Sequence, residues 1–147
     1  MNNINITGTD RLELIQYVYD VAEQLNIDLY EGFVDVDFVE KCVGGAAGYA
    51  DGDTDIVNVE IAFYDNGGEI PTYLLKKHIA HEFIHAQQLL SGRLVHKGLK
   101  LNKKDDKISY VVEWEGVDHY DVSYQDQPWE IEAYSMENDV MESAQCM

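Results

Sequence analysis

The sequence predicts a single α+β domain over residues 1–147, in which a central helix packs on a small antiparallel or mixed sheet. Helical spacing of apolar residues occurs at 9–25 and 71–92, and the segments between and after them alternate with the period of two that is typical of strands. A chain of 147 residues is long enough to bury one compact core. We find no internal repeat and no linker rich in Pro, Gly or Ser, so we expect one domain.

The N-terminal half predicts one helix followed by three strands. Thr9 can cap a helix that reaches about Leu25. Segments 28–39 and 55–64 alternate and predict strands that are buried on one side. Segment 43–50 is rich in Gly and Ala and predicts a strand that another part of the backbone approaches closely. The inward residues are Leu12, Ile15, Val18, Ala22 and Leu25 in the helix, and Tyr30, Val34, Val36, Phe38, Val57, Val59, Ile61 and Phe63 in the strands.

The C-terminal half predicts a helix, a hairpin and a second helix. After a turn at 65–68, Pro71 and Gly92 are residues favoured at the two ends of a helix. Residues 93–107 are basic, and we expect them to form turns. Segments 108–114 and 117–124 alternate on either side of Glu115-Gly116, which predicts a hairpin. Pro128 begins a final helix that reaches about Ser143.

The charge of the chain is strongly acidic and unevenly spread. It has 10 basic and 28 acidic residues, a net charge of −18. Residues 1–75 carry −13, residues 76–107 carry +5, and residues 108–147 carry −10. This balance argues against a nucleic-acid partner, because the phosphate backbone would be repelled. A well-solvated surface explains the acidity, and an acidic DNA mimic is an alternative that the basic block interrupts.

The sequence also bears on location. No run approaches the ~18 apolar residues of a membrane span. The start, Met-Asn-Asn-Ile-Asn-Ile, has no basic residue and no apolar stretch, so we expect no secretory signal. Cys42 and Cys146 lie far apart and are expected to be reduced thiols. We therefore expect a cytoplasmic protein without a membrane partner.

The helix at 71–92 contains His81-Glu82-Phe83-Ile84-His85, an H-E-x-x-H motif. A spacing of four puts both imidazoles on one helical face, where two nitrogens can bind one Zn²⁺. Glu82 can then take a proton from a metal-bound water. His78, His81, Glu82 and His85 form a stripe that is too polar to bury without a purpose. A separate apolar stripe can anchor the helix, and it consists of Leu75, Ile79, Phe83, Ala86 and Leu90.

The motif leaves the third metal ligand open. Catalytic zinc has three protein ligands, and the position six beyond His85 is Ser91 rather than His, which argues against a metzincin. His78, His96, His119 and the carboxylates remain, among them Glu130 and Glu132. Residues two apart on a helix point to different sides, so these two glutamates cannot both reach the metal comfortably. Asp51-Gly52-Asp53-Thr54-Asp55 fails as a calcium loop, because Ile56 stands where Gly is required.

His81-Glu82-x-x-His85-x-x-Gln88, followed by Pro128-Trp129-Glu130-x-Glu132-Ala133, resembles the minimal gluzincin metallopeptidases. These are small zincin-fold proteins of bacteria and phages, similar to the SprT-like and ImmA/IrrE-like families. The resemblance covers residues 71–143 by motif and 1–70 only by element order. It implies a zincin-like fold, a bound Zn²⁺ and a peptide or protein substrate. It also implies Glu130 as the third ligand, because Ala133 follows three residues later, and Glu132 is the alternative. Tyr134 stands where an acidic or amide side chain often lies, so we expect no supporting carboxylate there.

The resemblance implies two further features of the site. One edge strand pairs with the bound peptide, and 55–64 is our candidate. A Tyr or His stabilises the oxyanion; Tyr120, Tyr124 and Tyr134 are near enough in sequence, and Tyr124 is the candidate. His119 is expected to be exposed, and Gln88 either holds the metal helix or faces water. The prediction is a zinc metallopeptidase with Glu82 as general base. A catalytically inactive zincin-fold binding module is the alternative, and the oligomeric state stays open.

Overall fold

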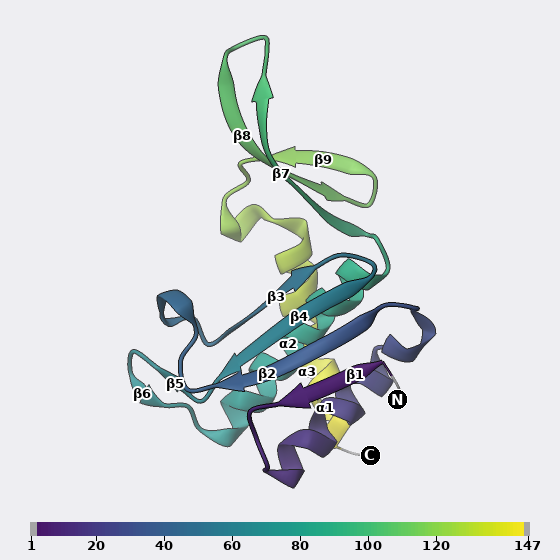
Figure 1. Ribbon diagram of the computed structural model, residues 1–147, viewed down its shortest axis with the longest axis vertical. Coiled ribbons are helices and arrows are strands. Elements are labelled where there is room, and N and C mark those ends of the chain that lie inside the picture. The colour runs from purple at the N-terminus through teal and green to yellow at the C-terminus, as the bar shows by residue number, and fades with distance from the viewer. Residues whose placement is uncertain (1–2, 146–147) are drawn as a thin grey trace.

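The computed structural model describes residues 3–145, which form a mixed four-stranded sheet, three α-helices and a projecting three-stranded sheet (Figure 1). The predicted α+β class is confirmed. Cys146 lies outside the described residues. The four-stranded sheet has the order β1-β2-β4-β3, in which β1, β2 and β4 are parallel and β3 is antiparallel to β4. Its strands are Ile4–Thr7 (β1), Phe33–Val39 (β2), Gly48–Gly52 (β3) and Ile56–Ala62 (β4).

The helices cover one face of this sheet and enclose the core (Figure 1). They are α1 (Leu12–Gln24), α2 (Thr72–Leu90) and α3 (Pro128–Gln145). Val34, Val36, Phe38, Val57, Val59 and Ile61 point into the core, as the alternation predicted. Among residues 3–145, no helix has the length and apolar character needed to cross a bilayer.

Helix α1 differs from its prediction at its start and in its buried face. It begins at Leu12 with Arg11 as N-cap, and the Thr9 hydroxyl accepts a hydrogen bond from the Arg11 N–H instead of capping the helix. Leu12 is exposed. Two overlapping stripes fit the helical period, and packing against α2 and α3 selects the one that contains Leu14, Tyr17, Val18, Val21 and Ala22.

Strand β4 was predicted to be the edge of the sheet, and this is wrong. It lies between β2 and β3, because the chain turns back so that β3 pairs with its outer side. The edge strands are β1 and β3; β3 overlaps the end of the segment predicted at 43–50, and a short 3₁₀ turn (Val43–Gly45) precedes it. The predicted close approach is found at Gly48: a Cβ there would lie 2.9 Å from the Glu60 carbonyl oxygen and 3.3 Å from Glu82 Cγ.

The second sheet has the order β7-β8-β9, with strands Leu94–Asn102, Lys107–Trp114 and Val117–Tyr120. The prediction of turns over 93–107 is confirmed only for residues 103–106, which join β7 to β8, and is wrong for most of the segment, which β7 occupies. Lys97 and Lys100 lie on β7, and a bulge near Lys97 breaks the alternation that would have revealed this strand. The predicted hairpin is confirmed, and Glu115 and Gly116 both have positive φ, as a two-residue hairpin turn requires.

Strand β9 and the turn at 65–68 differ slightly from their predictions. Strand β9 ends at Tyr120, four residues before the predicted end, and Tyr124 begins a 3₁₀ turn (Tyr124–Asp126) that leads into α3. The predicted turn at 65–68 joins two short strands, Tyr64–Asp65 (β5) and Gly68–Glu69 (β6). The 3₁₀ turn before α3 matters for the site, since it brings Tyr124 back toward the start of that helix.

Candidate metal centre

Helix α2 buries polar side chains on the side that carries the H-E-x-x-H motif. His81, Glu82 and His85 are all buried. On the other side of the helix, all members of the predicted apolar stripe pack in the core, which anchors the helix and fixes the direction of the motif. Buried polar groups are retained at a cost in desolvation, so each of these three requires a partner or a function.

Two helices supply three ligand atoms that converge on one point. Nε2 of His81 and Nε2 of His85 are 3.3 Å apart, and Glu130 Oε1 lies 3.0 Å from each of them. Donor atoms about 2.0–2.1 Å from a tetrahedral zinc ion are about 3.3 Å from one another. The group of His81, His85 and Glu130 could therefore hold a metal ion.

Glu132, the rival third ligand, is directed elsewhere. Its Oε1 accepts a hydrogen bond of 2.9 Å from Arg93 Nη1 and one of 3.2 Å from the Gln88 amide. Arg93 in turn lies over the Trp114 ring, with Cζ 4.7 Å from the ring centroid. The structure thus brings Glu130, and not Glu132, to the two histidines.

Each imidazole is held by a hydrogen bond at its other nitrogen. His85 Nδ1 lies 2.7 Å from Oε1 of Gln88, which is fully buried and donates from Nε2 to the Trp129 carbonyl. His81 Nδ1 lies 2.9 Å from Glu137 Oε2. With Nδ1–H donated in this way, the Nε2 atoms are left for a metal.

Glu137 was missed by the sequence analysis, which expected no supporting carboxylate because position 134 is Tyr. The carboxylate comes from one turn further along α3. Glu137 stands seven residues after Glu130, and this spacing puts both on the same face of a helix. That spacing is the signal that could have identified it. The Tyr134 ring packs on His81 instead, with centroids 4.6 Å apart.

The charges in the group stabilise one another. Burial alone raises the pKa of Glu130, but hydrogen bonds from His81 and His85 outweigh it and hold the pKa at about 2. Burial lowers the pKa of each histidine, and the hydrogen bonds to Glu130 and the nearby acids reverse this, so both pKa values are raised. Burial raises the pKa of Glu82. The pKa of Glu82 is thus raised while that of Glu130 is lowered, so Glu82 takes up a proton more readily than Glu130.

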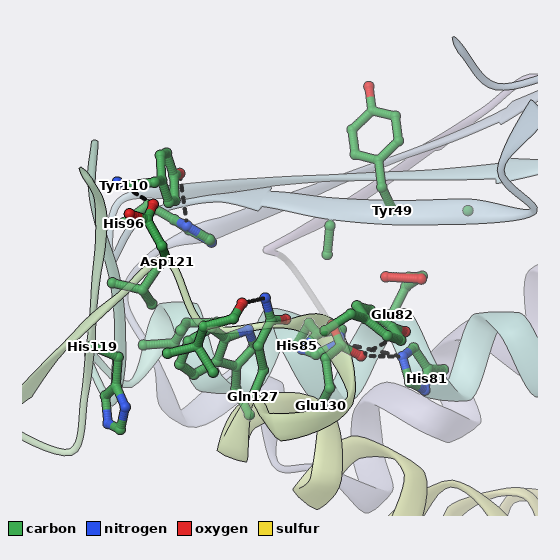
Figure 2. Close-up of a pocket in the computed structure, with 17 residues that line it drawn as sticks. Tyr49, His81, Glu82, His85, His96, Tyr110, His119, Asp121, Gln127 and Glu130 are labelled. Carbon is green, nitrogen blue, oxygen red and sulfur yellow. Dashed lines mark hydrogen bonds and ion pairs between the residues drawn. The ribbon is translucent and has the colours of Figure 1, made fainter. Parts of the chain in front are cut away.

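The group lies in a cleft of about 600 Å³ between β3 and the second sheet (Figure 2). Gly48, Tyr49 and Ala50 of β3 line one side, and His96 and Tyr110 line the far end from His81 (Figure 2). This cleft is large enough for a peptide segment.

Tyr124 and His119 also line the cleft. The Tyr124 hydroxyl lies 3.1 Å from Glu130 Oε1 and 2.9 Å from the Tyr134 hydroxyl. Burial and the hydrogen bond to Tyr134 raise the pKa of Tyr124, so it stays a donor. The prediction that His119 is exposed is wrong: its ring is half-buried against Trp129, with centroids 5.8 Å apart. Of the other histidines, neither His78 nor His96 belongs to the metal group.

The chain matches no protein-family model, no curated protein and no solved structure.

Proposed function

We propose that this chain is a zinc-dependent metallopeptidase of the gluzincin type. One observation carries the proposal: the three ligand atoms of His81, His85 and Glu130 converge beside buried Glu82 in a cleft. The arrangement matches the residue roles that the motif predicts, with two ligands and an acid from one helix and the third ligand from the next.

The donor set favours zinc. Two imidazoles and one carboxylate suit zinc, whereas calcium and magnesium take shells made almost wholly of oxygen. The spacing of the donors, 3.0 to 3.3 Å, suits the short bonds of a tetrahedral site. Bound zinc supplies a water whose pKa is lowered to about 7 and polarises the substrate carbonyl.

Glu82 is suited to act as general base and then as general acid. It follows His81 directly, lines the cleft, and is shielded from solvent. Because burial raises its pKa, its carboxylate can accept a proton from the attacking water and hold it until the leaving amine takes it. Gly48 lets β3 pass close to Glu82, since a Cβ at this position would lie 3.3 Å from Glu82 Cγ.

Tyr124 and strand β3 position the substrate. As the carbonyl oxygen gains negative charge, the Tyr124 hydroxyl can exchange its bond to Glu130 for one to that oxygen. The outer side of β3 is the edge of the sheet next to the cleft, so its N–H and C=O groups can pair with an extended peptide. The proposed substrate is therefore an extended peptide segment.

Elemental mass spectrometry of the purified chain tests the metal site, with Glu130→Ala and Glu132→Ala as a matched pair. We expect about one zinc per chain, lost in the first variant and retained in the second. Glu82→Gln should retain zinc and lose cleavage of a peptide library. A chain that holds no zinc after zinc is supplied and excess removed would refute the proposal. Zinc without cleavage by the unmodified chain would favour the inactive binding module.

A further inference from the structure

The projecting sheet exposes apolar side chains on one face. Leu99 pairs with Tyr110 and Leu101 with Ile108 across β7 and β8, so the four side chains share that face. We name these four residues the apolar ladder. Their exposed fractions are 72% for Leu99, 42% for Tyr110, 60% for Leu101 and 66% for Ile108. A contiguous apolar patch of this kind is typical of an interaction surface.

A β-bulge puts the two leucines on this face. His96 of β7 lies opposite Val112 of β8, and Gly98 lies opposite the next residue, Val111. Lys97 therefore has no partner on β8 and is the extra residue of the bulge. Without the bulge, Gly98 and Lys100 would take the places of the leucines beside Tyr110 and Ile108, since a shift of one residue reverses the faces of a strand. Gly98 has a φ of +82°, a conformation that glycine adopts without strain.

The apolar ladder is continuous with the cleft. Tyr110 belongs to both: it lines the cleft, and its hydroxyl lies 3.0 Å from Nδ1 of His96, another lining residue. Ile108 follows on the same face, farther out along the hairpin that projects away from the four-stranded sheet (Figure 1). A peptide that leaves the cleft past Tyr110 would therefore run along the ladder.

The charge around the ladder differs from that of the rest of the molecule. Residues 97–107 contain five lysines and two aspartates, whereas residues 1–75 carry −13 and residues 108–147 carry −10. Lys97 pairs with Asp118 and Glu113. Within the described part of the chain, Lys100 and Lys107 have no ion pair. An acidic segment would be repelled by the body of the molecule and attracted to the hairpin.

From the continuity and the charge together, we infer that the apolar ladder is a docking surface for the protein substrate. It binds an extended segment, next to the bond held in the cleft, in which aliphatic or aromatic side chains alternate with acidic ones. The apolar side chains contact the ladder. Lys100 and Lys107 alternate with Leu101 and Ile108 along their strands, so they lie on the opposite face of the hairpin and attract the acidic side chains through the field of the hairpin rather than by direct contact. This inference rests on the proposed function, because it assumes that the cleft holds a peptide.

Fluorescence anisotropy with defined peptides tests docking without turnover, in the Glu82→Gln background. The probes are fluorescein-labelled peptides of one length: Leu/Val alternating with Glu, Leu/Val with Lys, Ser with Glu, and Ser with Lys. We expect the first probe to bind tightest. Leu99→Ser combined with Leu101→Ser should weaken its binding about tenfold. Lys100→Glu combined with Lys107→Glu should reduce the preference for the Glu probe over the Lys probe, and the reduction should be larger at low salt because these lysines act through the field of the hairpin.

The matched control replaces two leucines that are equally exposed but lie elsewhere, Leu12 (78%) and Leu29 (76%), by serine. We expect this variant to bind like the parent, and thermal melting of every variant checks that it is folded. Equal binding of all four probes, or unchanged binding by the ladder variant, would overturn the inference. So would a dimer in sedimentation that the ladder variant abolishes, since the ladder would then join two copies of the chain. A failure of the proposed metallopeptidase function would be seen separately, as a chain without zinc or as no cleavage of the peptide library by the unmodified chain.

Discussion

Replacing Glu137 by Ala should weaken zinc binding by about 10–100-fold without unfolding the chain. Glu137 Oε2 lies 2.9 Å from His81 Nδ1, and only 5% of Glu137 is exposed. A hydrogen bond to a charged group contributes about 1.5–3 kcal/mol. At about 1.4 kcal/mol for each factor of ten, that is about 10–100-fold in affinity. Glu137 also forms an ion pair of 3.5 Å with Lys77, but the Lys77 side chain is 44% exposed, so this pair adds little to the effect.

Competition with a chromophoric zinc chelator measures this effect. Glu137→Gln retains an acceptor for the imidazole N–H but loses the charge, so its affinity should lie between those of the parent and the Ala variant. Glu142→Gln changes an exposed acid on the same helix and should have no effect. Melting curves of the chelated variants check folding. Glu130→Ala, which should lose zinc, is the positive control in the same assay. If Glu137→Ala then binds zinc as tightly as the parent, the reasoning is refuted.

His81 and His85, strand β3 and the thiol of Cys42 each allow a further test. Because the pKa values of His81 and His85 are raised in the absence of metal, zinc must displace protons there, and its affinity should rise with pH as these histidines deprotonate; zinc titrations that give the same affinity from about pH 5.5 to 8 would contradict this. Gly48→Ala places a Cβ 2.9 Å from the Glu60 carbonyl oxygen, and urea unfolding should show a loss of about 1–3 kcal/mol; a stability equal to that of the parent would mean that β3 can move away. Burial raises the pKa of the Cys42 thiol to about 11, so iodoacetamide at neutral pH should label it only after unfolding, as read by peptide mapping that separates the two cysteines; rapid labelling of the native chain would show that this thiol is accessible.

The helical half of the site could be predicted because its information is local. A spacing of four fixes His81 and His85 on one face of α2 whatever surrounds the helix. The apolar stripe of the same helix then indicates which face lies against the core. These two facts are enough to place the two candidate ligands and Glu82 on one side of α2 without any tertiary contact.

The choice between Glu130 and Glu132 depends on how α3 is rotated, which no local pattern gives. Trp129 and Ala133 are buried, and their packing turns Glu130 toward the histidines. Glu132 then faces Arg93, at the start of the second sheet. Glu137 was missed for the same reason, since its role depends on the rotation of α3 against α2.

The errors in the sheets have a different physical cause. Strand order depends on contacts between residues far apart in sequence, so the alternation of segment 55–64 predicted a strand but not its central place. Strand β7 was lost because the bulge at Lys97 shifts its alternation by one residue, and its lysines were taken for a turn. The edge of the four-stranded sheet and the projecting hairpin, which carry the proposed substrate contacts, were thus the least predictable parts of the fold.

Removal of zinc should lower the melting temperature but leave the chain folded. The core of buried apolar residues lies between the sheet and the helices and does not depend on the metal group. The hydrogen bonds from both histidines to Glu130 also leave these buried side chains with partners when zinc is absent. If zinc binds the folded chain and not the unfolded one, a free concentration about 100 times its Kd adds about 2.7 kcal/mol.

For a domain of this size, that stabilisation corresponds to about 5–10 °C in the melting temperature. Calorimetry of the zinc-loaded and chelated forms measures the shift, and far-UV circular dichroism measures the fold. A chelated chain that loses its helical signal would mean that zinc, rather than the core, holds α2 and α3 together. The buried contact between Gln88 and the Trp129 carbonyl argues against that outcome, because it joins the two helices without using the metal.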